Sequence, residues 1–415
     1  MYQQAYHASP RSSGGQRRNR SGGSRSGGYN RARSSSRRGK VVKQTIHPSK
    51  FIRAAKPVEI REYTPTNTFN DFTLHDLLKQ NVVKKGFTAP SEIQDKAIPV
   101  ALEGRDVVGI ADTGTGKTTA FTLPALHKIM TEPGHKMLVI APTRELAQQI
   151  EDELRSFAKG SGLFGALLIG GSAMGPQLRD LRATPAVVIG TPGRIKDHVE
   201  RGTLDLGTFD IVVLDEVDRM VDMGFIADIR FLLDAVHPVR QSLFFSATLD
   251  PKIEQLIHSF LTDPVTISVK TSETSANVAQ DVITYRDSVE KISKLHDLLN
   301  QEEVAKVLVF DETQRDVERL GKELASRGFR VDALHGGKTQ GQRSRALKRF
   351  RNNEISVLVA TDVAARGIDI SDITHVVNYS VPNAYEDYVH RIGRAGRAGR
   401  PGAAYTFLSL FEARF

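Results

Sequence analysis

The stretch Val107-Val108-Gly109-Ile110-Ala111-Asp112-Thr113-Gly114-Thr115-Gly116-Lys117-Thr118 joins a β-branched run to a glycine-rich loop and the start of a helical pattern. Glycines let the backbone of such a loop approach phosphate oxygens, and the following helix N-terminus offers free N–H groups. Lys117 would contact the β- and γ-phosphates of a nucleotide, and the Thr118 hydroxyl would ligate Mg²⁺. The general pattern has glycine where Ala111 stands, so the match is not strict. Further phosphate contacts are expected from Thr113, Gly114, Thr115 and Gly116.

A second chemical signal follows the apolar run Phe209–Leu214, where the sequence Asp215-Glu216-Val217-Asp218 begins. An apolar strand would deliver Asp215 to the carboxyl edge of a sheet, where it can hold Mg²⁺, usually through water. Glu216 would then orient or deprotonate an attacking water. An acidic cluster at a strand end is often only a helix N-cap. Together with the phosphate loop upstream, however, it favours an ATP site that carries out catalysis.

Short β-branched runs alternate with amphipathic helical stretches from Phe69 onward. This alternation predicts mostly parallel sheets flanked by helices on both faces, with the chemistry on loops at strand ends. We expect two similar α/β domains at residues 69–269 and 278–415, joined by a polar linker at residues 270–277. The predicted strands are Val107–Ile110, Met137–Ile140, Ala166–Ile169, Ala186–Ile189, Ile211–Leu214, Ser242–Phe245, Val265–Val269, Val307–Phe310, Val331–Leu334, Val357–Ala360, His375–Asn378 and Ala404–Leu408.

The composition suits two globular domains plus a tail, because the chain has 415 residues of which 40% are hydrophobic. The absence of cysteine excludes disulfides and thiolate zinc sites, and it fits a reducing compartment. No apolar run is long enough to span a bilayer, and the N-terminus lacks the apolar block of a signal peptide. We therefore expect a cytoplasmic protein with no membrane partner.

The net charge of +9 is concentrated in the N-terminal segment. Residues 1–58 contain 14 lysines and arginines and no acidic residue, whereas residues 59–415 hold 43 basic and 48 acidic residues, a net of −5. Residues 1–46 lack apolar periodicity and are rich in Arg, Ser and Gly, so we expect them to be disordered, with residues 47–68 as a linker. Such a tail can serve solubility alone. Its many cations and scattered tyrosines favour a nonspecific RNA tether.

With these motifs in place, residues 69–410 resemble the DEAD-box ATP-dependent RNA helicases of superfamily 2. The resemblance implies two RecA-like domains. Phe69 and the segment Gly86–Gln94 (G-F-T-A-P-S-E-I-Q) look like the adenine-reading Q motif of that family. By that motif's roles, the Gln94 amide would pair with the adenine edge and Phe69 would stack on the base. Phe87 is placed in the same site.

The resemblance also implies motifs that contact the RNA backbone without reading bases. In the first domain they are P-T-R-E-L-A at residues 142–147, the glycine pair at 170–171 and T-P-G-R at 191–194. In the second domain they begin at His335, Gln340 and Thr361. The expected partners are single-stranded and short duplex RNA. The expected RNA-binding residues are Pro142, Thr143, Arg144, Gly171, Thr191, Arg194, Gly336, Arg343 and Thr361.

The late segment H-R-I-G-R-A-G-R at residues 390–397 matches the last motif of the family. By the family's roles, Arg394 and Arg397 would be arginine fingers that stabilise charge on the transferring phosphoryl group. Gly367 and Asp369 would approach the ribose and phosphates. The residues expected to couple the nucleotide and RNA sites are Asp218, Ser246, Thr248, His390 and Arg391.

Two residues depart from the family pattern. Val217 replaces an alanine and gives D-E-V-D, and Ala395 replaces the commoner threonine of the last motif. The carboxylates and both finger arginines remain, so we expect catalysis to persist. The predicted function is ATP hydrolysis at an interdomain cleft, with Mg²⁺, coupled to RNA binding and to local duplex unwinding or remodelling of RNA–protein complexes. An ATP-gated RNA clamp remains an alternative. A DNA translocase is less favoured, because of the context of Gln94 and the motif at 191–194.

Overall fold

The computed structural model describes residues 46–54, 63–112, 114–269, 277–365, 370, 372–396 and 400–411, without the side chain of Glu386. Several predictions concern residues outside these ranges. They are the tail at residues 1–45, the linker at 270–276, and the site residues Thr113, Gly367, Asp369 and Arg397.

The first sheet has seven parallel strands within the described residues, in the order β3-β4-β2-β5-β6-β1-β7. These strands are β1 (Val107–Ala111), β2 (Met137–Ile140), β3 (Gly165–Leu168), β4 (Val187–Gly190), β5 (Ile211–Leu214), β6 (Gln241–Ser246) and β7 (Val265–Val269). The helices of this domain are α1 (Asp76–Lys84), α2 (Glu92–Leu102), α3 (Lys117–Thr131), α4 (Arg144–Phe157), α5 (Met174–Arg182), α6 (Pro192–Glu200), η2 (Leu206–Thr208), α7 (Val217–Asp222), α8 (Ile226–Ala235) and α9 (Pro251–Phe260).

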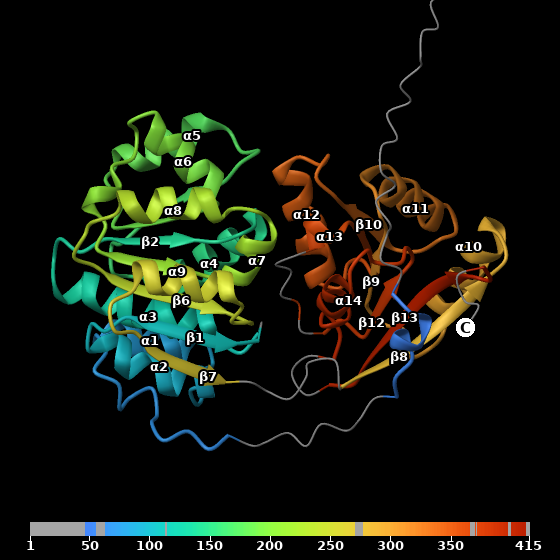
Figure 1. The fold of residues 1–415 in the computed structure, drawn as a ribbon, viewed down its shortest axis with the longest axis horizontal. Coiled ribbons are helices and arrows are strands. Elements are labelled where there is room, and N and C mark those ends of the chain that lie inside the picture. The colour runs from blue at the N-terminus through green and yellow to red at the C-terminus, as the bar shows by residue number, and fades with distance from the viewer. Residues whose placement is uncertain are drawn as a thin grey trace, which may run out of the picture. The chain divides into compact units, whose positions relative to one another are not determined.

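Both faces of the first sheet are buried, as Figure 1 shows by the helices on either side. Along β2, Met137 and Val139 join an apolar cluster with α2, α3 and α4, whereas Leu138 and Ile140 join a second cluster with α6, α8 and α9. A parallel strand covered on both faces therefore reads as an uninterrupted apolar run. The strand order also brings the carboxyl ends of β5, β6 and β1 side by side.

The second sheet has six parallel strands within the described residues, in the order β10-β11-β9-β12-β13-β8. These strands are β8 (Val278–Tyr285), β9 (Val307–Phe310), β10 (Val331–Leu334), β11 (Val357–Ala360), β12 (His375–Asn378) and β13 (Gly402–Ser409). The helices of this domain are α10 (Ser288–Leu299), α11 (Gln314–Ser326), α12 (Gln340–Arg351), α13 (Asp362–Ala365) and α14 (Tyr385–Ile392). One face of the sheet packs with α10 and α11, and the other packs with α12, α13 and α14.

The predicted α/β class and most strands are confirmed, with bounds that differ by one or two residues. Strand β8 was not predicted. It lies at the edge of its sheet and alternates buried Val278 and Gln280 with exposed Ala279 and Asp281. An edge strand with polar residues lacks the β-branched run that marks a central strand.

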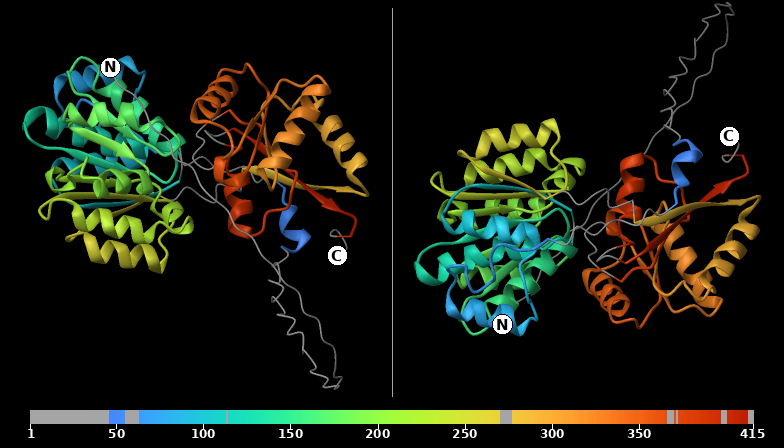
Figure 2. Two further views of the ribbon diagram at one scale, coloured as in Figure 1. Left: turned by 90° about the horizontal axis from the view of Figure 1, so that it is seen from above. Right: turned by 90° about the horizontal axis from the view of Figure 1, so that it is seen from below.

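Part of the stretch interpreted as a linker, residues 47–68, differs from that expectation. The 3-10 helix η1 (Pro48–Phe51) packs into the second domain, where Phe51 is fully buried and Arg53 forms an antiparallel bridge with Gln280. Figure 2 shows this blue segment beside the second sheet in both views. The linker interpretation missed this packing because it was based on extended, proline-containing sequence alone.

Candidate nucleotide and RNA site

Three neighbouring strands deliver the motifs of the nucleotide site. The phosphate loop follows β1, the acidic motif follows β5, and Ser246 ends β6. In the register of the sheet, Ile110 lies opposite Ser246 and Leu214 lies opposite Phe244. Polar groups that are separated by up to about 130 residues therefore meet at one edge because the strands are parallel and adjacent.

The phosphate loop turns into α3 at Gly116, which has φ 94° and forms the N-cap of the helix. A side chain at this position would clash with the amide of Gln94, so both the backbone conformation and the packing require glycine. Lys117 is buried, and its ammonium donates to the carbonyl of Ala111 at 3.0 Å. The Thr115 hydroxyl donates to the carbonyl of Asp112 at 2.8 Å, which holds the loop closed on itself.

The amide of Gln94 braces this loop. Its Nε2 donates to the carbonyl of Gly116 at 3.1 Å, and its Oε1 accepts from the Ser91 backbone N–H at 2.9 Å in a capping box of α2. An amide has two N–H donors and two acceptor lone pairs, so capacity remains on each atom for a base edge. The Gln94 side chain therefore has a structural role in holding the loop, in addition to the adenine contact that is predicted for it.

The acidic motif begins with the buried carboxylate of Asp215, which accepts from the Glu216 N–H at 3.0 Å. Burial raises the pKa of the Asp215 carboxyl, and the positive charge of Lys117 opposes that rise. Glu216 occupies the left-handed region at φ 55° and ψ 56°, a conformation that costs a non-glycine residue about 1–3 kcal/mol. Its carboxylate pairs with the buried guanidinium of Arg219.

Asp218 links the acidic motif to the end of β6. Its N–H donates to the Ser246 hydroxyl at 3.3 Å, and its carboxylate accepts from the Ala247 N–H at 3.1 Å. The predicted partnership of Asp218 with this motif therefore has direct hydrogen bonds. Thr248 lines a cavity of about 160 Å³ together with Asp218, His390 and Arg394.

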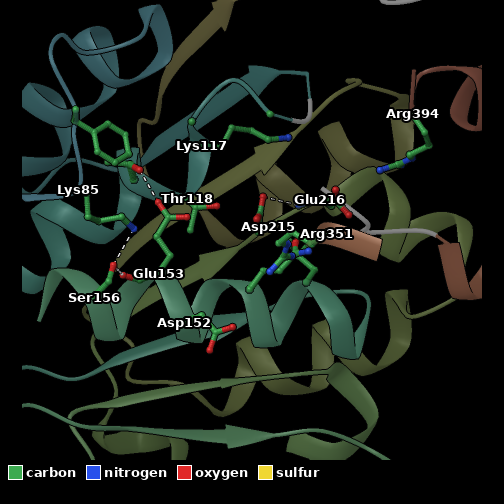
Figure 3. A pocket seen from close by; sticks show the side chains of 16 residues that line it. Lys85, Lys117, Thr118, Asp152, Glu153, Ser156, Asp215, Glu216, Arg351 and Arg394 are labelled. Atoms are coloured by element: carbon green, nitrogen blue, oxygen red, sulfur yellow. Dashed lines mark hydrogen bonds between the residues drawn. The ribbon is translucent and has the colours of Figure 1, made fainter. Parts of the chain in front are cut away.

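A larger cavity of about 510 Å³ opens over the phosphate loop and is seen in Figure 3. It is lined by Gly114, Gly116, Lys117, Thr118, Asp215 and Glu216 of the first domain, with Arg351 and Arg394 of the second. Both an ATP phosphate chain and the water that attacks it could be enclosed by these groups. This one cavity brings together the predicted catalytic residues, apart from Arg397, which lies outside the described residues.

Phe87, and not Phe69, is the aromatic residue that lines this cavity. Phe69 is 6% exposed and packs edge-on against Phe87, with ring centroids 5.8 Å apart. Lys85, beside Phe87, lies over the Phe157 ring at 4.3 Å and donates to the Ser156 hydroxyl at 2.8 Å. Phe87 therefore faces the cavity and Phe69 packs behind it, while the base stacking expected of Phe69 stays a prediction.

In the last motif, at residues 390–397, Arg391 and His390 have different surroundings. Arg391 is buried and pairs with Asp362 through Nε at 2.6 Å and Nη2 at 2.7 Å, and it donates to the Ser380 carbonyl. It therefore joins α14 to α13. Burial, together with the positive charges of Arg219 and Arg394, lowers the pKa of His390.

The predicted RNA residues of the first domain gather at three loops. Thr143 caps α4 by accepting from the Leu146 N–H at 3.2 Å, and it follows the buried Pro142. The Arg144 guanidinium lies so close to Gly171, which has φ 74°, that a β-carbon there would clash with it. Arg194, three residues after Thr191, donates to the carbonyl of Ser172 at 3.2 Å. These motifs, distant in sequence, therefore contact one another.

Among the predicted RNA-binding residues of the second domain, Arg343 already forms an ion pair with another side chain. Arg343 donates from Nε to the Glu145 carboxylate at 2.7 Å, and both side chains are buried. Gly336 is exposed and lies against the amide of Gln314, and Thr361 is buried at the N-terminus of α13. A phosphate contact by Arg343 requires it to share or leave Glu145.

Two segments of the chain match models of known protein families. Residues 91–256 match the DEAD/DEAH box helicase model, and residues 290–399 match the helicase conserved C-terminal domain. The chain belongs to the DEAD/DEAH box helicase family. No helix in the described residues combines the length and apolar character needed to cross a bilayer.

Two curated relatives of this DEAD/DEAH box protein are named as RNA helicases. DEAD-box ATP-dependent RNA helicase 30 of Arabidopsis thaliana is 42% identical over 359 residues, which cover 85% of this chain and 61% of that protein. ATP-dependent RNA helicase CshA of Limosilactobacillus reuteri is 40% identical over 342 residues, covering 82% and 69%. The chain thus spans about three fifths to two thirds of the length of these relatives.

Solved DEAD-box structures share the fold over most of the chain. Dbp5 of S. cerevisiae, bound to RNA and ADP BeF3, has a TM-score of 0.73 at 28% identity and covers 83% of this chain and 90% of its own. Mss116p, bound to ssRNA and AMP-PNP, has a TM-score of 0.75 at 27% identity and covers 86% and 77%. The RecA-like description of both domains is confirmed by this likeness.

Several residues of the site were missed by sequence reasoning, among them Arg351, which also lines the larger cavity. Arg219 pairs with Glu216, Glu145 pairs with Arg343, and Lys85 lines the cavity beside Phe87. Glu145 and Arg219 lie within or directly beside quoted motifs of this family, so their position was a usable signal. Lys85 immediately precedes the Q-motif segment, and only its proximity could have suggested it.

Proposed function

We propose that this protein hydrolyses ATP in response to RNA and uses the cycle to bind RNA and to open short duplexes locally. The proposal is carried by one observation: Lys117, Asp215, Glu216 and Arg394 line the same cavity of about 510 Å³. A phosphate-binding loop, a buried carboxylate pair and a guanidinium in one enclosure are the groups that phosphoryl transfer needs. The named relatives, both described as ATP-dependent RNA helicases, support this proposal.

The residues of the phosphate loop bind and orient the triphosphate. The backbone N–H groups at the start of α3 and the ammonium of Lys117 face the space where its charge would lie. Glu216 is placed to hold the attacking water and accept its proton, once its carboxylate moves from Arg219. Arg394 supplies positive charge to the transferring group, an effect worth about 10³–10⁵ in rate for an arginine finger.

The residues near the loop fit a nucleotide-bound Mg²⁺. The Asp215 carboxylate and the Thr118 hydroxyl line the same cavity, and both offer the hard oxygen donors that Mg²⁺ prefers. Such an ion needs only one or two protein ligands, because waters and phosphates complete its shell. When bound, it neutralises negative charge on the β- and γ-phosphates.

RNA would be held by the backbone contacts predicted from the motifs of both domains. Gly171 and Gly336 are exposed, and Arg144 and Arg194 border the loops after β3 and β4. Dbp5 and Mss116p are described as bound to RNA with a nucleotide analogue, which supports the same partner here. Single strands and short duplexes are the proposed substrates. Stacking is worth about 1.4 kcal/mol per step in DNA, so a clamp of this size can open a few pairs.

The D-E-V-D form of the acidic motif retains its function in this proposal. Val217 is fully buried in the cluster that also contains Val108, Leu214 and Met220. The valine side chain lies in apolar packing, and the carboxylates of Asp215 and Asp218 keep their hydrogen bonds from the Glu216 and Ala247 N–H groups. We therefore propose that the extra volume is accommodated by the core and not by the active site.

The test is the ATPase activity of Arg394→Ala with and without RNA. We expect RNA-stimulated kcat to fall by about 10³-fold or more, with KM for ATP little changed, because the guanidinium acts mainly on the transition state. Arg400→Ala removes an exposed cation close in sequence and serves as the matched control. Stimulated turnover near wild type in Arg394→Ala would contradict the proposed site. A duplex-displacement assay on the wild type separates unwinding from clamping alone.

A further inference from the structure

Residues 46–53, which we name the strap, precede the first domain in sequence but pack on the second. Ile46 and Phe51 join the apolar cluster of the second sheet, and Phe51 is fully buried. Arg53 and Gln280 exchange two backbone hydrogen bonds, of 2.9 and 2.7 Å. Lys50 lies over the ring of Tyr385 at 4.9 Å from its centroid. The strap therefore adds to the edge strand β8 and to the helix α14 at the same time.

The centre of this packing is Tyr388 of α14. The Phe51 ring meets it edge-on, with centroids 4.8 Å apart and an interplanar angle of 66°. The Tyr388 hydroxyl donates to Oε1 of Gln280 at 2.9 Å, and both side chains are buried. Phe51 thus closes a three-residue contact in which the strap, β8 and α14 each supply one side chain.

The same contact reaches the loop that carries Arg394. Ala395 and Ile392 belong to the apolar cluster that contains Phe51 and Tyr388. A β-carbon on Gly396, which has φ 67°, would lie 2.9 Å from Val278, two residues before Gln280. The loop after α14 therefore packs tightly against the start of β8, and its backbone at Gly396 cannot move closer to that strand.

We propose that Phe51 of the strap is a positioning residue for Arg394. By filling the space between β8 and α14, its ring fixes the end of α14 and the following loop, and so fixes the direction of the Arg394 guanidinium. This inference rests on the proposed role of Arg394 in ATP hydrolysis. It assigns a catalytic consequence to a segment that lies outside both family matches, since those begin at residues 91 and 290.

A positioning role of this kind predicts a selective kinetic effect. Gln94 and Lys117 lie on α2 and α3 of the first domain, whereas the apolar cluster that contains Phe51 is made of residues of the strap and the second domain, so ATP binding should be unaffected. Arg394 acts on the transition state, and misplacement of a catalytic group by about 1 Å can cost up to about a hundredfold in rate. Loss of Phe51 should therefore lower kcat and leave KM unchanged.

The experiment compares Phe51→Ala, Phe51→Leu and Ile52→Ala in the full chain. Ile52 is adjacent in the strap but 51% exposed, which makes it the matched control. For Phe51→Ala we expect RNA-stimulated kcat to fall by about tenfold or more, with KM for ATP within about twofold of wild type. The leucine variant keeps apolar volume and should recover most of the loss. Ile52→Ala should behave as wild type.

Further measurements keep the test decisive if the alanine variant does not fold. Tyr388→Phe keeps the ring and removes the hydroxyl with its hydrogen bonds to Gln280 and Thr406, and it should lower stimulated kcat severalfold at unchanged KM. Hydrogen exchange of α14 should accelerate in Phe51→Ala and not in Ile52→Ala. Equal kinetics of Phe51→Ala and Ile52→Ala would overturn the inference, and so would wild-type turnover of Tyr388→Phe when the alanine variant cannot be measured.

The two proposals fail in distinguishable ways. If Arg394→Ala abolishes stimulation while Phe51→Ala matches its control, only the positioning role is wrong. If Arg394→Ala itself retains stimulated turnover, the proposed site is wrong whatever the strap variants do. A kcat loss in Phe51→Ala accompanied by an equal rise in KM would show general damage to the protein and would also overturn the inference.

Discussion

Gln94 and Gly116 are joined by a hydrogen bond of 3.1 Å from the amide nitrogen to the backbone carbonyl. The helix α2, which carries Gln94, is therefore tied directly to the N-cap of α3, the helix that follows the glycine-rich loop. Because Gly116 leaves no space for a side chain beside this amide, the two groups cannot shift independently. The groups expected to contact the base and the phosphates of the nucleotide would thus be linked by a direct hydrogen bond.

Gln94→Glu tests this connection with almost no change in volume. The variant loses the Nε2 donor and places a buried carboxylate oxygen against the Gly116 carbonyl, which then keeps only its helical hydrogen bond from the Ala120 N–H. A buried carboxylate oxygen that faces a carbonyl without a donor costs about 1–3 kcal/mol. We expect KM for ATP to rise by about five- to a hundredfold and the preference for ATP over GTP to weaken. Steady-state kinetics with both nucleotides measures this. Unchanged KM and unchanged selectivity would show that neither role of the amide matters.

Val217→Ala tests whether the D-E-V-D motif is a packing variant. The substitution removes two methyl groups from a fully buried side chain, so the free energy of unfolding should fall by about 1.5–3 kcal/mol. RNA-stimulated kcat should stay within about twofold of wild type, because Asp215 and Glu216 keep their backbone positions. Chemical denaturation and ATPase assays together give the answer. A large change in kcat with no loss of stability would place Val217 in the chemistry and not in the core.

Much of the nucleotide site could be predicted because its chemistry is local in sequence. The loop around Lys117 and the acidic pair at Asp215 each follow an apolar strand, and parallel pairing brings their ends together. The central strands were identified for the same reason, since burial on both faces leaves an unbroken apolar run.

What could not be predicted depends on tertiary contacts. Strand β8 carries Gln280 and Asp281, and only its pairing with β13 makes it a strand. The strap residue Phe51 looks like an isolated aromatic in a polar stretch until Tyr388 lies against it. Phe69 and Phe87 are both apolar aromatics near the Q motif, and sequence does not say which of them faces the cavity. The choice is made by packing, which has no short-range signal.

Asp95, which directly follows Gln94, gives a prediction about how the stability of the fold depends on pH. Burial would raise the pKa of its carboxyl, but hydrogen bonds from Tyr63, Asn67 and the Thr66 N–H outweigh this and lower it. A carboxyl whose pKa is lower in the folded state stabilises the fold above its unfolded pKa, and this contribution is lost as pH falls through the folded value. The unfolded chain binds more protons in that window, so stability rises with pH there.

Asp95→Asn should therefore destabilise the fold by about 1–3 kcal/mol at pH 7, and the difference from wild type should shrink below about pH 4. Urea midpoints at several pH values measure the effect. Glu103→Gln, at an exposed position one residue beyond the same helix, is the matched control and should show no such pH-dependent difference. A gap that stays constant down to pH 2 would mean that the carboxylate charge is not what stabilises this contact.

The N-terminal segment gives the last prediction, which concerns RNA affinity. Residues 1–45 contain 11 arginines and lysines and no acidic residue. Each cation that neutralises a phosphate of a single strand adds about −0.7 to the slope of log affinity against log salt concentration. If four of them bind RNA, deleting residues 1–45 should make the slope shallower by about 3 while leaving ATP turnover at saturating RNA unchanged. The deletion keeps the strap, so the arrangement around Arg394 is not disturbed.

A tail with the same residues in shuffled order should restore the steep slope, because a phosphate tether depends on charge and not on sequence. A tail in which the same arginines and lysines are replaced by glutamine should not. Equal slopes for the full chain and the deletion would show that these cations do not contact the bound RNA.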